Sequence, residues 1–323
     1  MTRRVLVTGA AGFVAANLAR RLVHDGQEAV LVVRPGSDLW RLDGLDVRIA
    51  SVELSDPDAV SALMREARPE WVFHLAAHGG YSTQRDLSRI VATNVVGSMN
   101  VVNAAVAAGA EHVVCAGSSS EYGFKDHAPS EDELVEPNSD YAVTKAAATL
   151  YGGYAARRSG ARVSTLRLYS VYGAYEEPSR LVPQLLLNAM RGILPPLVAP
   201  ETARDFVYID DVVDAFLSVA ASSPARKDAV YNVGSGRRST LREVVEIVRE
   251  EFGVAAVPAW GGMAQRSWDT AVWTCDNRRI AQDVGWRPAT ELREGLRAMM
   301  EWLRGDTAMH ARYLEKSSLP PAS

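Results

Sequence analysis

Short apolar segments alternate with stretches of helical periodicity through the first half of the chain, and this alternation restricts the fold more than any other feature. Short apolar runs bounded by turn residues are typical of buried strands. The strands are predicted at Val5–Val7, Ala29–Val33, Val47–Ser51, Trp71–Leu75, Val113–Ala116 and Val163–Leu168, and the helices at Ala15–His24, Asp58–Ala67, Asn94–Ala108 and Ala142–Arg158. This β-α alternation predicts an α/β fold with a doubly wound parallel sheet of the Rossmann type.

The pattern loosens after residue 170. A proline-rich piece, "ILPPLVAP" (193–200), and later helices at Leu241–Phe252 and Leu292–Leu303 predict a smaller C-terminal lobe. Phe206–Ala221 and Tyr231–Val233 are expected to return to the main sheet. The expected division is a first domain at 1–170 with returning segments at about 205–235, a second lobe at 171–204 and 236–305, and a flexible tail at 306–323.

Composition narrows the class of protein. The chain has 323 residues, is 47% hydrophobic and carries a formal net charge of −4, so nothing indicates a nucleic-acid partner. We see no signal-peptide pattern and no apolar stretch long enough to span a bilayer. Two cysteines, Cys115 and Cys275, show no metal-ligand spacing. We therefore expect a cytoplasmic protein with no metal and no membrane or nucleic-acid partner.

The first chemical motif is "VLVTGAAGFVAANL" (5–18), in which a strand runs into Gly9 and Gly12 and then into a helix. Small residues let the backbone approach a pyrophosphate, and the helix N-terminus favours that anion. A glycine-rich turn by itself is common, but at the first strand of a βαβ pattern it predicts dinucleotide binding.

The end of the second strand, "LVVRPGS" (31–37), bears on which dinucleotide binds. An NAD site usually places an acid here for the ribose hydroxyls, whereas an arginine accommodates the 2′-phosphate of NADP. Arg34 occupies the position, with Ser37 nearby. This favours NADP, with NAD as second choice and a solvated arginine as the alternative interpretation.

Two further motifs predict catalysis. In "YAVTK" (141–145), Tyr141 and Lys145 are four residues apart and share one face of a helix. An adjacent ammonium and a cationic nicotinamide would lower the pKa of the phenol. Only four residues of the chain are lysines, so an ammonium here is a selective choice over arginine. Ser118, in "CAGSSSEYG" (115–123) at the end of a neighbouring strand, can complete a relay to a substrate oxygen.

With these motifs in place, the sequence resembles the extended short-chain dehydrogenase/reductase family, which contains nucleotide-sugar epimerases, dehydratases and ketoreductases. The resemblance covers about residues 3–305. It rests on "TGAAGFVA", "HLAA" (74–77), "NVVGSMNVVNAA" (94–105), "GSSSEYG", "YAVTK", "YSVYGAY", "RDFVYIDDVVDAF" (204–216) and "YNVGSG" (231–236).

The resemblance assigns roles to individual residues. It implies that Ser118, Tyr141 and Lys145 are the catalytic triad and that His74 is a strand residue. The cofactor contacts expected are Gly9, Gly12, Phe13, Val14, Arg34, Glu53, Leu54, Leu75, Ala76, Ala77, Asn94, Tyr141, Lys145, Tyr169 and Val171, although the family usually has aspartate at position 53.

For a nucleotide-diphosphate sugar, the resemblance implies contacts from the second lobe. Arg204 and Arg266 match positions that bind the diphosphate or its nucleoside, and a guanidinium fork suits phosphate oxygens. Ser119, Ser120 and Ser170 are the other expected substrate contacts, with Ser170 replacing the usual asparagine. The segment "QRSWDTAVW" (265–273) is most similar to some CDP-sugar enzymes.

The reaction can be narrowed from the same residues. A 4,6-dehydratase of this family carries acids directly after the catalytic hydroxyl, but Ser119 and Ser120 stand there and Glu121 is displaced by one. This argues against dehydration. The "GSSSEYG" form more closely resembles a 4-keto-6-deoxyhexose reductase of the family, and with Arg34 this resemblance favours reduction of an NDP-4-keto-(6-deoxy)hexose, with Tyr141 as proton donor. The alternatives are an NAD-dependent 4-epimerase and, more remotely, a non-catalytic NADP-binding regulator. Family members commonly form homodimers through helices at about 86–108 and 142–158, and we expect the same here.

Overall fold

The chain begins as the alternating strands and helices that its pattern predicts. The computed structural model describes residues 2–81, 83–262 and 273–317. The main sheet contains β1 (Arg4–Thr8), β2 (Glu28–Val33), β3 (Arg48–Ser51), β4 (Trp71–His74), β5 (His112–Ser118), β6 (Arg162–Leu168) and β10 (Val230–Val233). The helices between its first six strands are α1 (Phe13–His24), η1 (Trp40–Leu42), α2 (Pro57–Ala67), α3 (Leu87–Val91), the π-helical η2 (Ala92–Gly97), α4 (Ser98–Ala107), η3 (Ser119–Tyr122) and α5 (Asp140–Ser159).

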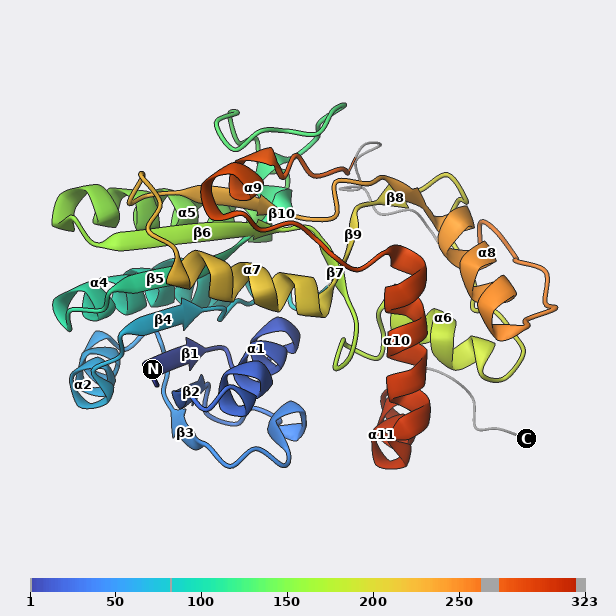
Figure 1. Cartoon of the computed structure of the whole chain (residues 1–323), viewed down its shortest axis with the longest axis horizontal. Coiled ribbons are helices and arrows are strands. Elements are labelled where there is room, and N and C mark those ends of the chain that lie inside the picture. Colours follow the sequence, from blue (N-terminus) through green and yellow to red (C-terminus); the bar gives the residue numbers. More distant parts are fainter. Residues whose placement is uncertain (1, 82, 263–272, 318–323) are drawn as a thin grey trace.

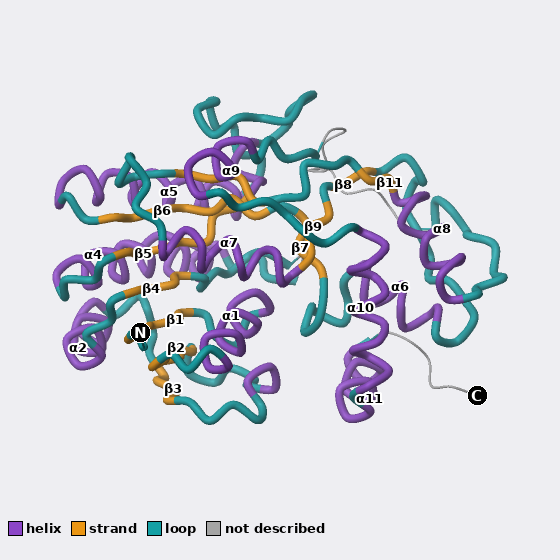
Figure 2. Tube along the Cα trace, viewed as in Figure 1, coloured by secondary structure: helices purple, strands orange, loops and turns teal. Residues whose placement is uncertain are grey.

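All seven strands are parallel, in the order β10-β6-β5-β4-β1-β2-β3 (Figures 1 and 2). Strand β1 lies between β2 and β4, so that Val5 pairs with Ala29 on one side and with Trp71 on the other. The strand order reverses at β1, and in doubly wound sheets a ligand binds at such a point, beyond the carboxyl ends of the strands. The predicted Rossmann-type fold class is confirmed.

Both faces of the sheet are covered by helices. Successive side chains of a strand point to opposite faces, so Val5 and Val7 enter one hydrophobic cluster and Leu6 enters another. Helix α1 and α7 (Ile209–Ala221) cover the first face, and α2, α4 and α5 cover the second (Figure 1). Burial on both faces explains the apolar runs of the central strands, such as Val5–Val7 in β1 and Ala29–Val33 in β2.

The remaining elements form a smaller group at the right of Figure 1 and around the sheet's upper edge. They are β7 (Ser170–Tyr172), α6 (Leu181–Ala189), β8 (Ala203–Arg204), β9 (Phe206–Tyr208), β11 (Ser239–Thr240), α8 (Leu241–Phe252), α9 (Arg278–Val284), α10 (Leu292–Gly305) and α11 (Thr307–Lys316). Strands β8 and β11 pair with each other, as do β7 and β9.

The two segments expected to return to the main sheet do so in different ways. Tyr231–Val233 lies within β10, which joins the sheet beside β6. In Phe206–Ala221, β9 pairs with β7, and the rest of the segment is helix α7, which packs on the face of the sheet against β5 and β6. The two acids in its first turn, Asp210 and Asp211, favour a helix start.

The end of the chain also differs from the expected flexible tail. Thr307–Lys316 is helix α11, which begins at Asp306, whose side chain accepts a hydrogen bond from Met309 N. Its Tyr313 is fully buried and packs edge-on against Trp40 and Trp302. This aromatic packing fastens the helix to the rest of the protein.

One helical run contradicts our expectation about membranes. Leu87–Ala107 has 21 residues and a mean hydropathy of 1.5, enough by length and composition alone to cross a bilayer. In the structure it packs against α2 and α5, and 44% of its most apolar window is buried. Core helices pass the same test, so the run is weak evidence for a membrane span.

Candidate active site

A cleft of about 830 Å³ lies beyond the carboxyl ends of β1, β4, β5 and β6. This is the edge at which a doubly wound sheet binds its ligand. The structure brings most of the predicted site residues together here. Those that line the cleft are Gly9, Gly12, Phe13, Val14, Leu75, Ala77, Ser118, Ser119, Ser120, Tyr141, Lys145, Tyr169, Ser170, Val171 and Arg204.

The glycine turn after β1 forms the floor of the cleft. Gly9 has a φ of +69°, and a Cβ on it would lie 2.6 Å from the backbone N and Cα of Ala76. Only glycine fits this close approach. Gly12 donates to Gly9 O at 2.8 Å and precedes α1, so the first N–H groups of that helix lie at the cleft. The turn therefore offers an anion-binding helix end, as a dinucleotide pyrophosphate requires.

Ser118, Tyr141 and Lys145 come from two elements. Ser118 is the last residue of β5, and Tyr141 and Lys145 lie one turn apart on α5, which packs on β5. The N-cap Ser139 accepts from Ala142 N at 3.2 Å and fixes the start of that helix. Lys145 is buried and donates to Ala116 O at 2.6 Å.

Burial governs the protonation of this group. It raises the pKa of Tyr141 to about 12 because the phenolate loses its hydration, while a hydrogen bond with Ser118 acts in the opposite direction. Burial also lowers the pKa of Lys145, against the opposing charges of Glu121 and Cys115. We predicted that Lys145 would help to lower the pKa of Tyr141. In the protein by itself, burial outweighs the effect of Lys145, so the pKa of Tyr141 lies above its ordinary value.

The serine-rich stretch after β5 is a compact turn in which each hydroxyl has a contact. Ser118 Oγ lies 2.7 Å from Ser120 Oγ and accepts from Ser120 N at 3.2 Å. Ser119 Oγ accepts from Trp273 Nε1 at 2.9 Å. Glu121 completes a capping box by accepting from Ser118 N at 2.8 Å. The three serines face the cleft, whereas the Glu121 carboxylate is buried beneath them.

Two predicted cofactor contacts have a structural role beside the cleft. The Asn94 side chain accepts from His78 N at 2.8 Å and donates to His78 O and to Thr144 Oγ1, so its amide holds the loop after β4 against α5. Ala76 presents its backbone to Gly9. Neither residue is part of the cleft lining. The predicted strand residue His74 is buried between Thr8 and Ser98, and burial lowers its pKa to about 3.

Three more predicted cofactor contacts lie outside the cleft lining. Arg34 follows β2, and its Nε is buried with no hydrogen-bond partner among the described residues. Leu54 is buried and packs against Gly97. Glu53 is exposed. Their contact with a cofactor stays a prediction.

Four of the five predicted substrate-binding residues lie in the cleft lining, and the fifth lies outside the described residues. Ser119, Ser120, Ser170 and Arg204 line the cleft. The Arg204 guanidinium lies 5.1 Å from the centre of the Trp273 ring, a cation–π contact at the cleft wall. Arg266 lies outside the described residues.

Sequence reasoning missed a charged pair in the cleft, Glu176 and Arg180. Glu176 is 4% exposed, lies 3.7 Å from Arg180 Nε, and its Oε2 has no hydrogen-bond partner within the described ranges. Burial raises the pKa of this carboxyl to about 8, and Arg180 opposes the shift. The only signal in the sequence was two opposite charges four residues apart, directly after "YSVYGAY".

No group of three or more His, Cys, Asp or Glu side chains able to hold a metal ion occurs in the part of the chain that the structure describes. The cleft instead combines a glycine turn, a helix N-terminus, a phenol, an ammonium and a serine hydroxyl. These groups suit dinucleotide binding together with proton transfer to and from a substrate oxygen.

The fold thus defines a Rossmann-type oxidoreductase, and the predicted Ser118, Tyr141 and Lys145 lie together in its cleft. The chain belongs to the NAD-dependent epimerase/dehydratase family, whose model matches residues 5–234. This confirms the resemblance to extended short-chain dehydrogenases/reductases, and the protein is an NAD(P)-dependent enzyme of that family.

Known relatives match nearly the whole chain. It is 32% identical to a UDP-glucose 4-epimerase of Mycolicibacterium smegmatis, over 93% of this chain and 98% of the relative. It is 29% identical to a dTDP-glucose 4,6-dehydratase of Streptomyces griseus, over 99% and 100%. Among solved structures, MoeE5 in complex with UDP-glucuronic acid and NAD is 33% identical, with a TM-score of 0.81 over 93% of this chain and 99% of that one. MoeE5 has also been solved with UDP-glucose and NAD.

Proposed function

We propose that the protein is an NAD-dependent UDP-sugar 4-epimerase. The observation that carries this proposal is the similarity to MoeE5, whose complexes hold NAD together with UDP-glucose or UDP-glucuronic acid. The similarity to a UDP-glucose 4-epimerase supports the same reaction. Epimerisation replaces ketoreduction, which was our first expectation. The relatives named above give no support for ketoreduction.

Dehydration is the second candidate, because one relative is a dTDP-glucose 4,6-dehydratase. The serine turn argues against it. Ser119 and Ser120 stand where a dehydratase carries acids, and both Glu121 oxygens are occupied, one by Ser118 N and one by Arg167. The buried Glu121 therefore offers no carboxylate to the cleft.

The residues present fit a dinucleotide. Gly9 packs closely on the backbone of Ala76, and the N-terminus of α1 follows the same turn. Together they form a binding site for the pyrophosphate. Phe13, Val14, Leu75 and Ala77 line the same side of the cleft. NAD is the proposed cofactor in place of NADP, and when bound it would supply the acceptor and donor of the hydride at the sugar C4.

The protein's own groups handle the proton. Tyr141 takes the proton of the C4 hydroxyl as the C4–H bond breaks, which leaves a 4-keto sugar, and it gives the proton back when hydride returns to the opposite face. Ser118 donates a hydrogen bond to the same oxygen and stabilises the charge that develops there. The raised pKa of Tyr141 must fall when the positively charged nicotinamide and the Lys145 ammonium act on it together.

A homodimer is the proposed assembly. Apolar side chains are exposed on two helical segments that pack together: Leu87 and Val91 on α3, and Val143, Leu150 and Tyr154 on α5. Leu150 is 66% exposed, a costly position for leucine in an isolated subunit. Light scattering should show a dimer that Leu150→Glu converts to a monomer, while Val257→Glu, at a position 84% exposed elsewhere, leaves it intact. A monomeric wild type would refute this assembly.

The function is tested with purified protein, UDP-glucose or UDP-glucuronic acid, and no added reductant. Chromatography should resolve a second sugar, the C4 epimer, at equilibrium. Tyr141→Phe removes only the phenolic hydroxyl and should lower turnover by about a hundredfold or more. Tyr154→Phe is the matched control on the same helix, outside the cleft lining, and should keep full activity. Absence of any C4 epimer from either sugar would refute the proposal.

A further inference from the structure

A buried ion pair lies beneath the catalytic serine and has no role in the mechanism above. Glu121 is 0% exposed and Arg167 is 5% exposed. Arg167 Nε donates to Glu121 Oε2 at 2.9 Å. Glu121 comes from the turn after β5, and Arg167 comes from β6, next to β5 in the sheet.

The second oxygen of Glu121 holds the catalytic serine. Glu121 Oε1 accepts from Ser118 N at 2.8 Å, so the carboxylate bridges the backbone of Ser118 and the guanidinium of Arg167. The Ser118 hydroxyl leaves this backbone toward the cleft, where it also hydrogen-bonds Tyr141. The direction of that hydroxyl thus depends on the bridge below it.

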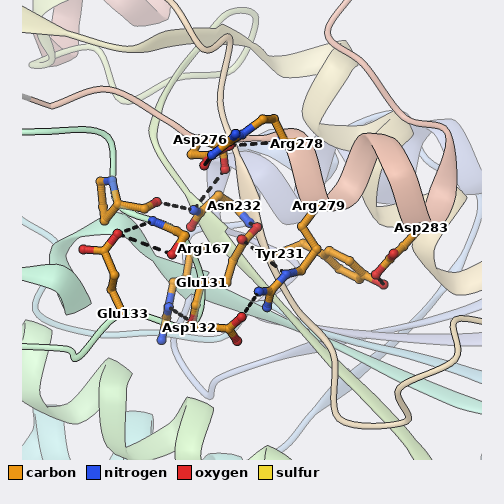
Figure 3. A network of polar contacts seen from close by, with 12 residues as sticks. Glu131, Asp132, Glu133, Arg167, Tyr231, Asn232, Asp276, Arg278, Arg279 and Asp283 are labelled. Carbon is orange, nitrogen blue, oxygen red and sulfur yellow. Dashed lines mark hydrogen bonds and ion pairs between the residues drawn. The ribbon is translucent and has the colours of Figure 1, made fainter.

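The surrounding sequence makes room for the pair and anchors it. A Cβ on Gly117 would lie 2.9 Å from Glu121 Oε1, so glycine is required at that position. Arg167 also donates to Tyr122 Oη at 2.8 Å, and Tyr122 donates to Asn232 Oδ1 at 2.7 Å. Figure 3 shows how Arg167 and Asn232 continue into a wider polar network that reaches Glu131 and Arg279.

The Glu121 carboxylate of the pair also acts on the site by its position: it accepts from Ser118 N, and Lys145 donates to Ala116 O, two residues earlier on the same strand. The Glu121 carboxylate raises the pKa of both Lys145 and Tyr141, in opposition to burial at Lys145 and together with it at Tyr141. The other titratable or charged groups that act on these two residues are Cys115, Tyr81 and Arg180, and Lys145 in turn acts on His74. Of these groups, only Glu121 acts on both residues.

We propose that Glu121 and Arg167 are positioning residues for catalysis: Glu121 fixes Ser118 through its backbone N–H and supplies the negative charge that keeps Lys145 an ammonium, and Arg167 holds Glu121 in place. The proposal rests on the proposed function for the roles of Ser118 and Tyr141. A buried ion pair is often replaceable by apolar side chains without loss of stability. A purely structural pair would therefore be dispensable here, whereas a positioning pair would not.

The positioning role is tested in a background without the buried cation, Arg167→Met. Glu121→Ala in that background removes the acceptor for Ser118 N, and kcat for C4 epimerisation should fall about tenfold or more with KM changed less than about twofold. Glu121→Gln in the same background restores an amide oxygen as acceptor and should recover part of the lost kcat, because Arg167 no longer holds the side chain. Equal kcat in the two double variants would overturn the positioning role.

The charge is tested independently of activity. The chain has only four lysines, so the Cε signals in a carbon-13 NMR titration are few, and Lys145→Arg assigns the one of interest. Glu121→Gln keeps the volume of the side chain and removes its charge, and the Lys145 signal should titrate at a lower pH than in the wild type. An unchanged titration would overturn the electrostatic part of the proposal.

Glu131→Gln is the matched control. Glu131 belongs to the same network and accepts from Asn232 N at 2.9 Å, but it does not contact Ser118. This variant should keep the wild-type kcat and Lys145 titration, and a change equal to that of Glu121→Gln would overturn the assignment to Glu121. A wild type inactive on every UDP-sugar, with the Lys145 shift still present, would refute the proposed function and leave this electrostatic role standing.

Discussion

Glu176 provides the sharpest prediction about stability, because burial raises its pKa from 4.5 to about 8. Between these values the folded protein keeps a proton that the unfolded chain has lost. The stability due to the neutral carboxyl is therefore complete below about pH 4.5 and is lost as the pH rises through about 8. At about 1.36 kcal/mol per pKa unit, the loss amounts to about 5 kcal/mol.

Glu176→Gln should remove this dependence, since the amide is neutral at every pH. Urea unfolding between about pH 5 and about pH 9 should show a free energy of unfolding that falls for the wild type and falls about 4 kcal/mol less for the variant. Glu177→Gln is the matched control, because Glu177 is the next residue and pairs with Arg41 at 3.0 Å. It should retain the wild-type slope. Equal slopes for the wild type and Glu176→Gln would refute the reasoning.

Three further predictions concern binding. Gly9→Ala should reduce the NAD that copurifies with the protein to less than about a tenth, because the new Cβ would lie 2.6 Å from Ala76 N. Gly26→Ala is the control: Gly26 has a similar φ, but a Cβ there would enter open space, so this variant should retain the copurifying NAD. Arg204→Ala should weaken UDP binding about tenfold or more in calorimetry through loss of a charge-assisted contact, and unchanged affinity would remove Arg204 from the site. Arg34→Asp should weaken NADP binding about tenfold or more in a fluorescence titration, without weakening NAD binding. An equal loss of affinity for both cofactors would contradict the predicted contact between Arg34 and the 2′-phosphate.

The sheet and most of the cleft were predictable because their signals are local. Apolar runs, the glycine turn and the four-residue spacing of Tyr141 and Lys145 are visible in a short window of sequence. The register Ser118↔Leu168 between β5 and β6 is not visible there, so the bridge from Ser118 to Arg167 could not be predicted. The role of Glu121 was hidden for the same reason.

Other errors came from competing tertiary contacts. The helix of Thr307–Lys316 has a polar sequence and depends on buried Tyr313 and its aromatic neighbours. The raised pKa of Tyr141 reflects burial, which sequence spacing does not reveal.

The central claim is that hydride leaves the sugar C4 and returns to it while Tyr141 exchanges the proton. The most direct measurement uses UDP-glucose or UDP-glucuronic acid labelled with deuterium at C4, purified protein and no added reductant. The account predicts that mass spectrometry and NMR will show a C4 epimer that still carries deuterium at C4. A 6-deoxy-4-keto product, loss of the label to solvent, or turnover only with stoichiometric consumption of NADPH would contradict it.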